Sequence, residues 1–77
     1  MITEQNLIDL GFKRVDEPKA NFYYYELVIG EICLLSRAND EVKDNHWKIQ
    51  FYDYYNPEIS LLEDLQNLIT ILQKITK

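Results

Sequence analysis

The sequence predicts an α+β domain: a three- to four-stranded antiparallel meander with a short N-terminal helix and a long C-terminal helix packed on one face. Three observations lead to this fold class. Apolar and polar side chains alternate over residues 46–54, as in a strand with one buried face. Residues 29–32 (IGEI) have the pattern of a two-residue β-hairpin turn. A leucine-rich stripe at helical spacing runs through residues 61–75.

The first predicted element is a short helix that ends at Leu10. Thr3 is a suitable N-cap, because its hydroxyl can accept a hydrogen bond from a free backbone N–H of the first turn. Gly11 suits the left-handed position after a helix, and Phe12 can then fold back on Leu7. A short strand over residues 12–15 should follow, ending in a polar loop over residues 16–21.

Gly30 sets the register of the next two strands. A two-residue turn at Gly30 and Glu31 places Ile29 opposite Ile32. A polar loop over residues 38–45 then leads into a third strand, predicted over residues 46–54 and broken at residues 56–58 (NPE).

Alternation along the strands divides the aromatic residues between two faces. Glu26 would be costly beneath a helix without a partner, so its face should point away from the helices. The predicted core face contains Tyr23, Tyr25, Leu27, Ile29, Ile32, Leu34, Trp47, Ile49 and Phe51. The opposite face also carries Val28 and Cys33, and its candidate interaction surface consists of Phe22, Tyr24, Leu35, Arg37, Lys48, Tyr52 and Tyr54.

The closing helix is predicted to start with a capping box formed by Ser60 and Glu63. Its apolar stripe consists of Leu61, Leu65, Leu68, Leu72 and Ile75, widened by Leu62, Ile69 and Ile71. Eight apolar positions exceed what one thin sheet needs, which favours self-association.

Length and charge narrow the function classes. We expect 77 residues to form one domain, residues 1–77, with a thin core. Residues 40–64 carry seven acidic residues and two lysines, a net charge of −5, and no basic stripe for phosphates is visible, so we expect no direct nucleic-acid binding. The chain shows no leader peptide and no apolar run of the roughly 20 residues that span a bilayer, so a cytoplasmic protein without membrane contact is expected.

Catalytic and metal chemistry have little support in the sequence. One cysteine and one histidine exclude an intrachain disulfide and leave a metal site without a second soft ligand. His46 with Asp44 or Asp53 as its partner resembles a general base, but a surface histidine is the preferred interpretation. Cys33 is interpreted as a small apolar filler. The acidic loop over residues 39–45 lacks the central glycine of a calcium loop. We therefore expect a non-enzymatic protein without a cofactor.

The stretches LGFK, YYYELVIGEICLLSRAND and HWKIQFYDY, followed by the leucine-rich helix, resemble short uncharacterised proteins of bacteria and their phages. The resemblance spans nearly the whole chain, and its motifs belong to the fold rather than to any chemistry. It implies no activity for particular residues. It does imply a setting in which small acidic proteins often act as inhibitors or sequestering proteins of phage–host conflict.

The leading hypothesis is a small acidic binding module that acts through protein–protein contacts, as a homodimer or small oligomer. One alternative is an oligomeric sponge for a small cyclic nucleotide, with bases stacked on Tyr24, Tyr52, Tyr54 or Trp47 and phosphates bound by Arg37, Lys48 or the Lys13–Arg14 pair. Another is a DNA-mimic inhibitor, whose acidic residues 40–64 imitate phosphates. An ordinary solvated sheet face remains a further interpretation of the aromatic residues.

Overall fold

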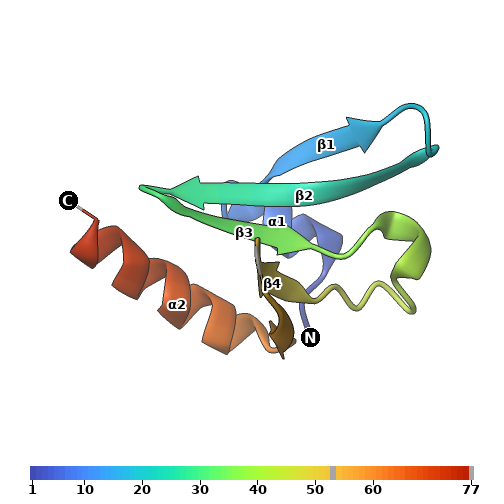
Figure 1. Ribbon diagram of the computed structural model, residues 1–77. Coiled ribbons are helices and arrows are strands. Elements are labelled where there is room, and N and C mark those ends of the chain that lie inside the picture. Colours follow the sequence, from blue (N-terminus) through green and yellow to red (C-terminus); the bar gives the residue numbers. More distant parts are fainter. Residues whose placement is uncertain (53, 77) are drawn as a thin grey trace.

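The computed structural model describes residues 1–52 and 54–76, with the backbone alone for residues 54–57. Over these residues the elements are α1 (Glu4–Asp9), β1 (Lys13–Glu17), β2 (Phe22–Ile29), β3 (Ile32–Ser36), the 3₁₀ helix η1 (Asn39–Glu41), β4 (Ile49–Phe51), β5 (Tyr54–Ile59) and α2 (Leu62–Ile75). The strands form one antiparallel sheet in the order β1-β2-β3-β4-β5, which is their order in the chain. Both helices lie on the same side of the sheet (Figure 1). The predicted α+β meander is confirmed, with five described strands in place of three or four.

Helix α1 begins and ends as its sequence predicts. The Thr3 hydroxyl accepts a hydrogen bond from the Asn6 N–H at 3.1 Å, and the Asn6 side chain accepts one from the Thr3 N–H at 2.9 Å. Gly11 adopts a φ of 94° after the last turn, a conformation that glycine takes without strain. The Phe12 N–H then donates to the Leu7 carbonyl at 3.0 Å, which closes the helix and turns Phe12 into the core.

The hairpin between β2 and β3 has the predicted turn. Gly30 adopts a φ of 61°, and Ile29 pairs with Ile32. The same register pairs Leu27 with Leu34, so both side chains point to the helix side of the sheet. Strand β1 lies one to two residues beyond its predicted bounds, over Lys13–Glu17, and pairs with β2 along its whole length.

The predicted third strand over residues 46–54 is wrong in extent. Strand β4 covers only Ile49–Phe51, and β5 follows at residues 54–59, where a break was expected. The Trp47 N–H donates to the Ile2 carbonyl at 2.8 Å, so at this position the chain pairs with the N-terminal segment and not with a strand of the sheet. Proline is tolerated in β5 because this strand is an edge of the sheet, where one side of the backbone needs no partner.

Helix α2 starts later than predicted. Its N-cap is Leu61, whose side chain makes no capping hydrogen bond, so the predicted capping box of Ser60 and Glu63 is wrong. The Ser60 carbonyl instead lies 3.2 Å from His46 Nε2. The loop over residues 38–45, expected to be irregular, contains η1 and two residues with positive φ, Asp44 and Asn45.

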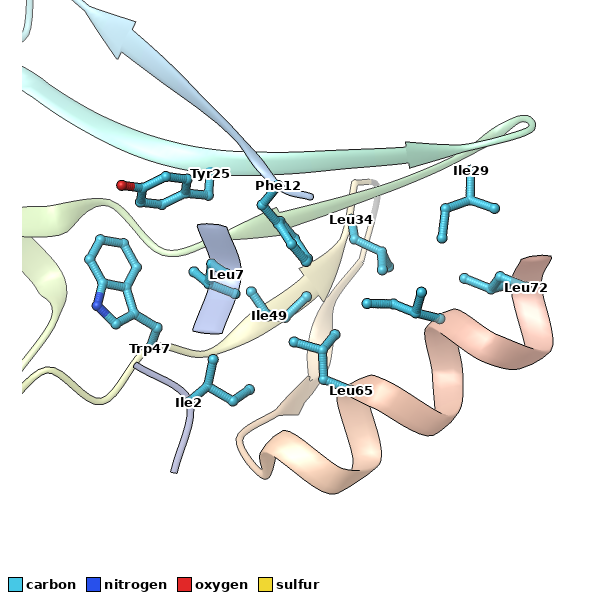
Figure 2. Close-up of a cluster of buried hydrophobic side chains, with 11 residues drawn as sticks. Ile2, Leu7, Phe12, Tyr25, Ile29, Leu34, Trp47, Ile49, Leu65 and Leu72 are labelled. Atoms are coloured by element: carbon cyan, nitrogen blue, oxygen red, sulfur yellow. The ribbon is translucent and has the colours of Figure 1, made fainter. Parts of the chain in front are cut away.

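The core lies between the sheet and the two helices (Figure 2). Its fully buried members come from the N-terminal segment, α1, β3, β4 and α2, and the predicted face assignment of the strands is confirmed. The buried residues are Ile2, Leu7, Phe12, Tyr25, Ile29, Leu34, Trp47, Ile49, Leu65, Ile69 and Leu72. Tyr23, Leu27, Ile32 and Phe51, also assigned to this face, are half-buried against them.

Candidate interaction surface

The face of the sheet that points away from the helices, here called the outer face, is formed by the alternate residues of the central strands. No helix in the described part of the chain lies over it (Figure 1). Phe22 and Tyr24 of β2 and Leu35 of β3 are half-buried there, although they lie opposite the core. These side chains therefore partly shield one another, while leaving apolar surface accessible.

A depression of about 380 Å³ forms where these residues meet the end of β3. Its wall is aromatic and aliphatic on the β2 and β3 side and polar on the β4 and β5 side. The residues that line it are Phe22, Tyr24, Leu35, Ser36, Arg37, Ala38, Glu41, Gln50 and Glu58. A mixed wall of this kind suits a ligand that presents both an apolar group and hydrogen-bonding groups.

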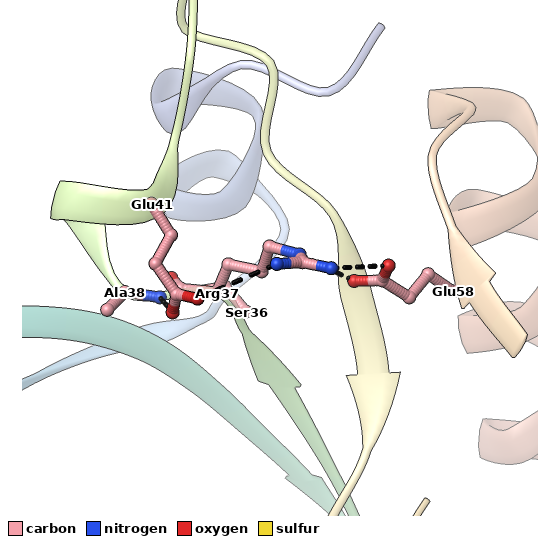
Figure 3. A network of polar contacts seen from close by, with 5 residues as sticks. All are labelled: Ser36, Arg37, Ala38, Glu41 and Glu58. Carbon is pink, nitrogen blue, oxygen red and sulfur yellow. Dashed lines mark hydrogen bonds and ion pairs between the residues drawn. The ribbon is translucent and has the colours of Figure 1, made fainter. Parts of the chain in front are cut away.

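Arg37 is held in place by two carboxylates (Figure 3). Its Nε and Nη2 atoms each donate to Glu58 at 2.7 Å, in a bidentate pair, and Nη1 lies 3.6 Å from Glu41. The hydrogen bonds from Arg37 lower the pKa of the Glu58 carboxyl, and the same contacts raise the pKa of Arg37. Glu58 belongs to β5 and Arg37 follows β3, so the pair bridges β4 and fixes the polar wall of the depression.

A second depression, of about 400 Å³, adjoins the first and shares Arg37 and Glu41 with it. Its other lining residues are Met1, Lys43, Asp44, His46 and Lys48. Three basic side chains, those of Arg37, Lys43 and Lys48, thus gather against two acidic ones in a chain whose net charge is −5.

The structure brings four of the predicted surface residues together in the first depression: Phe22, Tyr24, Leu35 and Arg37. Lys48 lines the second depression. Tyr52 is 63% exposed and lines neither, and the side chain of Tyr54 lies outside the described residues.

Two residues of the polar wall, Gln50 and Glu58, are absent from the predicted interaction surface. Alternation along the strand predicts Gln50 on the outer face, and its pairing with Leu35 across β3 and β4 agrees with that. Glu58 has no such signal, because its strand was not predicted.

Trp47 does not belong to the outer face, which removes it from the residues expected to stack on a base. It is buried, its Nε1 donates to Asn45 Oδ1 at 3.0 Å, and its ring lies 5.4 Å from that of Tyr25. The hydroxyls of Tyr23 and Tyr25 both donate to Glu4 of α1, at 3.0 and 2.6 Å. These aromatic residues therefore join the sheet to α1 and the N-terminal segment.

The basic residue Arg14, expected as one phosphate ligand, is engaged on the core side. Its guanidinium lies 3.6 Å from the centre of the Tyr23 ring and donates to Asp16 at 3.0 Å. The Lys13–Arg14 pair is thus not part of either depression.

The residues considered for catalysis are placed as follows. Cys33 is half-buried, and burial raises the pKa of its thiol, with a further contribution from Glu26. A raised pKa disfavours the reactive thiolate. His46 contacts the Ser60 carbonyl, and Asp53, one of its two predicted partners, lies outside the described residues.

In the part of the chain that the structure describes, no three His, Cys, Asp or Glu side chains cluster in a way that could hold a metal ion. Neither described α-helix has the length and apolar character needed to cross a bilayer.

No model of a known protein family matches the chain, and comparisons with curated proteins and with solved structures gave no significant match. The layout of a helix, antiparallel strands and a C-terminal helix is present. The bacterial or phage origin that the sequence stretches suggest gains no support from these comparisons.

Proposed function

We propose that the protein is a small, acidic, non-enzymatic binding module whose outer face docks a protein partner. The observation that supports this most is the depression itself, in which Phe22, Tyr24 and Leu35 face the fixed Arg37–Glu58 pair. Aromatic residues and arginine are enriched at the centres of protein interfaces, whereas most other charged residues are depleted there.

The arrangement favours one mode of recognition. An apolar side chain of the partner contacts the ring of Tyr24 and the side chains of Phe22 and Leu35, and is thereby removed from water. Polar groups of the partner bond to the remaining hydrogen-bonding capacity of Glu58 and Gln50. Because Glu58 already holds Arg37 in one geometry, little side-chain entropy is lost when the partner binds. The biological role that we favour is that of an inhibitor or sequestering protein in phage–host conflict, acting in the cytoplasm.

A cyclic nucleotide is the second candidate, because the basic depression adjoins the aromatic one. In this alternative the base stacks on Tyr24 and the phosphate lies near Lys43 and Lys48. Fewer residues are available to bind the nucleotide than the sequence predicts, because Trp47 is buried and the guanidinium of Arg14 lies over the Tyr23 ring.

The DNA-mimic alternative ranks last. Of the seven acidic residues over positions 40–64, Glu41 and Glu58 both form ion pairs with Arg37, so their charges are partly neutralised. A phosphate mimic needs its carboxylates free to meet a basic partner.

Affinity capture from the native host tests the leading proposal when it is combined with a matched pair of variants. The immobilised protein should retain a partner that Tyr24→Ala loses and that Val28→Ala keeps. Val28 lies on the same face and strand but lines neither depression. Circular dichroism and thermal unfolding should show that both variants are folded.

Equal retention by Tyr24→Ala and the unmodified protein would contradict the proposed surface. A thermal shift with one member of a panel of cyclic nucleotides, absent in Tyr24→Ala, would instead favour the nucleotide alternative.

A further inference from the structure

Helix α2 carries a second apolar stripe beside the one that it buries. Leu65, Ile69 and Leu72 form the buried stripe. Three other positions of the predicted apolar stripe are largely exposed: Leu61 by 55%, Ile71 by 54% and Ile75 by 68%. Together with the half-buried Leu68 they are here called the flank stripe (Leu61, Leu68, Ile71 and Ile75); Leu61 is the N-cap of α2, and the other three lie on one flank of the helix.

The spacing of the flank stripe is that of a helix–helix seam. Leu61, Leu68 and Ile75 are seven residues apart, and Asp64 and Ile71 form the second seven-residue row between them. Apolar residues at such alternating steps of three and four meet a partner helix by interlocking side chains. Within the described chain α2 uses its other stripe for the sheet, and of the flank stripe Leu68 alone is known to pack in part against the core.

Charge determines which arrangement of two helices fits. The first turn of α2 carries Glu63 and Asp64, and its last turn carries Lys74. In a parallel pair, Asp64 would face Asp64 of the second copy inside the seam, and the two like charges would repel each other. In an antiparallel pair centred between Leu68 and Ile71, Asp64 lies level with Ile75 of the second copy and one residue from the level of Lys74, and the two-fold axis repeats this contact.

We propose that the occupant of the flank stripe is a second copy of this chain, and that α2 forms an antiparallel homodimer through it. The apolar side chains of the seam are few, and stable interfaces bury about 800 Å² per partner, so we expect a reversible dimer at micromolar concentrations. Because α2 lies on the opposite side of the sheet from the outer face (Figure 1), the dimer leaves both outer faces accessible. The dimer can then engage a bivalent target at both faces, with a gain in avidity that needs no new contact.

This inference and the proposed function rest on different residues and can fail separately. Sedimentation equilibrium over a roughly hundredfold range of micromolar concentrations should show the unmodified protein passing from monomer to dimer. Ile71→Lys places a charge in the seam and should raise the dimer dissociation constant by about tenfold or more. Gln73→Lys adds the same charge to an exposed position on the other flank of α2 and should leave the constant unchanged.

Charge reversal tests the orientation. Asp64→Lys and Lys74→Asp should each weaken the dimer about fivefold or more, and the double variant should restore it, because the pairing is then reversed on both copies. Gln66→Lys and Gln73→Asp introduce similar charges into the same turns but away from the seam, so they correct for effects on the helix dipole.

Three outcomes would overturn the proposal. The first is a protein that stays strictly monomeric over the whole concentration range. The second is a dimer whose dissociation constant is unchanged by Ile71→Lys. If Tyr24→Ala then abolishes that dimer, self-association occurs through the outer face. The third is a double charge reversal that fails to restore the dimer, which would exclude the antiparallel pairing.

Discussion

Leu34 and Leu35 are adjacent leucines of β3 that face opposite sides of the sheet, and they provide a matched test of the fold and the surface. Leu34 is completely buried, whereas Leu35 is half-buried and lines the outer depression. Leu34→Ala leaves a cavity in a closed core and should lower the free energy of unfolding by about 3–5 kcal/mol. Leu35→Ala removes a side chain that already contacts water on one side, and should cost about 1 kcal/mol.

The expected difference is large on the scale of this chain. At roughly 0.05–0.15 kcal/mol per residue, a protein of 77 residues has a total stability of about 4–12 kcal/mol. Urea unfolding followed by circular dichroism should show the contrast. With a denaturant slope near about 1 kcal/mol/M, the midpoint should fall by about 3 M or more for Leu34→Ala and by about 1 M for Leu35→Ala.

For partner binding, the larger effect is expected from Leu35→Ala. Leu35→Ala should stay folded and lose affinity for a captured partner, because Leu35 lines the depression. Equal midpoint shifts for the two variants, or a larger shift for Leu35→Ala, would refute the assignment of the two faces.

Two further predictions concern pH. Burial and the hydrogen bond to Glu4 raise the pKa of Tyr25 from 10.0 to about 12, so its contribution to stability is fully present below about pH 10 and is lost as the pH rises through about 12. The free energy of unfolding, measured by urea titration, should therefore fall over this alkaline range by an amount on the order of 2 kcal/mol, and Tyr25→Phe should flatten the decline; an unchanged decline in the variant would assign it to other groups. The pKa of Glu58 is lowered from 4.5 by its bond to Arg37, so its contribution is present above that value and is lost as the pH falls through the lower folded value. Glu58→Gln should cost about 1 kcal/mol at neutral pH and reduce the loss of stability on acidification, whereas parallel acid curves for the two proteins would contradict this account.

Local signals in the sequence were sufficient for several elements. The Thr3 cap and the turn at Gly30 depend only on residues within a few positions, and both have the predicted geometry. The face assignment required one additional argument, the cost of burying Glu26, and the strand pairing agrees with it. In each case the interactions that determine the local structure are made within a short segment of the chain.

The missing elements depend on distant parts of the chain. Strand β5 contains the sequence NPE, which breaks a strand in the middle of a sheet but is tolerated at an edge, and the sequence does not state where the edge will lie. Without β5, neither Glu58 nor the fixed geometry of Arg37 could be predicted. The N-cap of α2 is Leu61 rather than Ser60, whose carbonyl contacts His46, 14 positions earlier in the chain.

Helix α2 shows a different limit of sequence reasoning. Eight apolar positions predict that the helix is amphipathic, but not which of them face the sheet. Which positions form the buried stripe and which form the flank stripe is determined by how α2 packs on the sheet.

The two edge strands affect how the protein behaves at high concentration. Four of the five residues of β1 are charged and exposed: Lys13, Arg14, Asp16 and Glu17. At the opposite edge, β5 contains Pro57, which has no N–H to donate to an added strand. Charged and proline-bearing edges resist strand-to-strand pairing between molecules, which is the route to fibrils and amorphous aggregates. A sheet protected in this way can present aromatic residues to solvent without growing into larger β-structures.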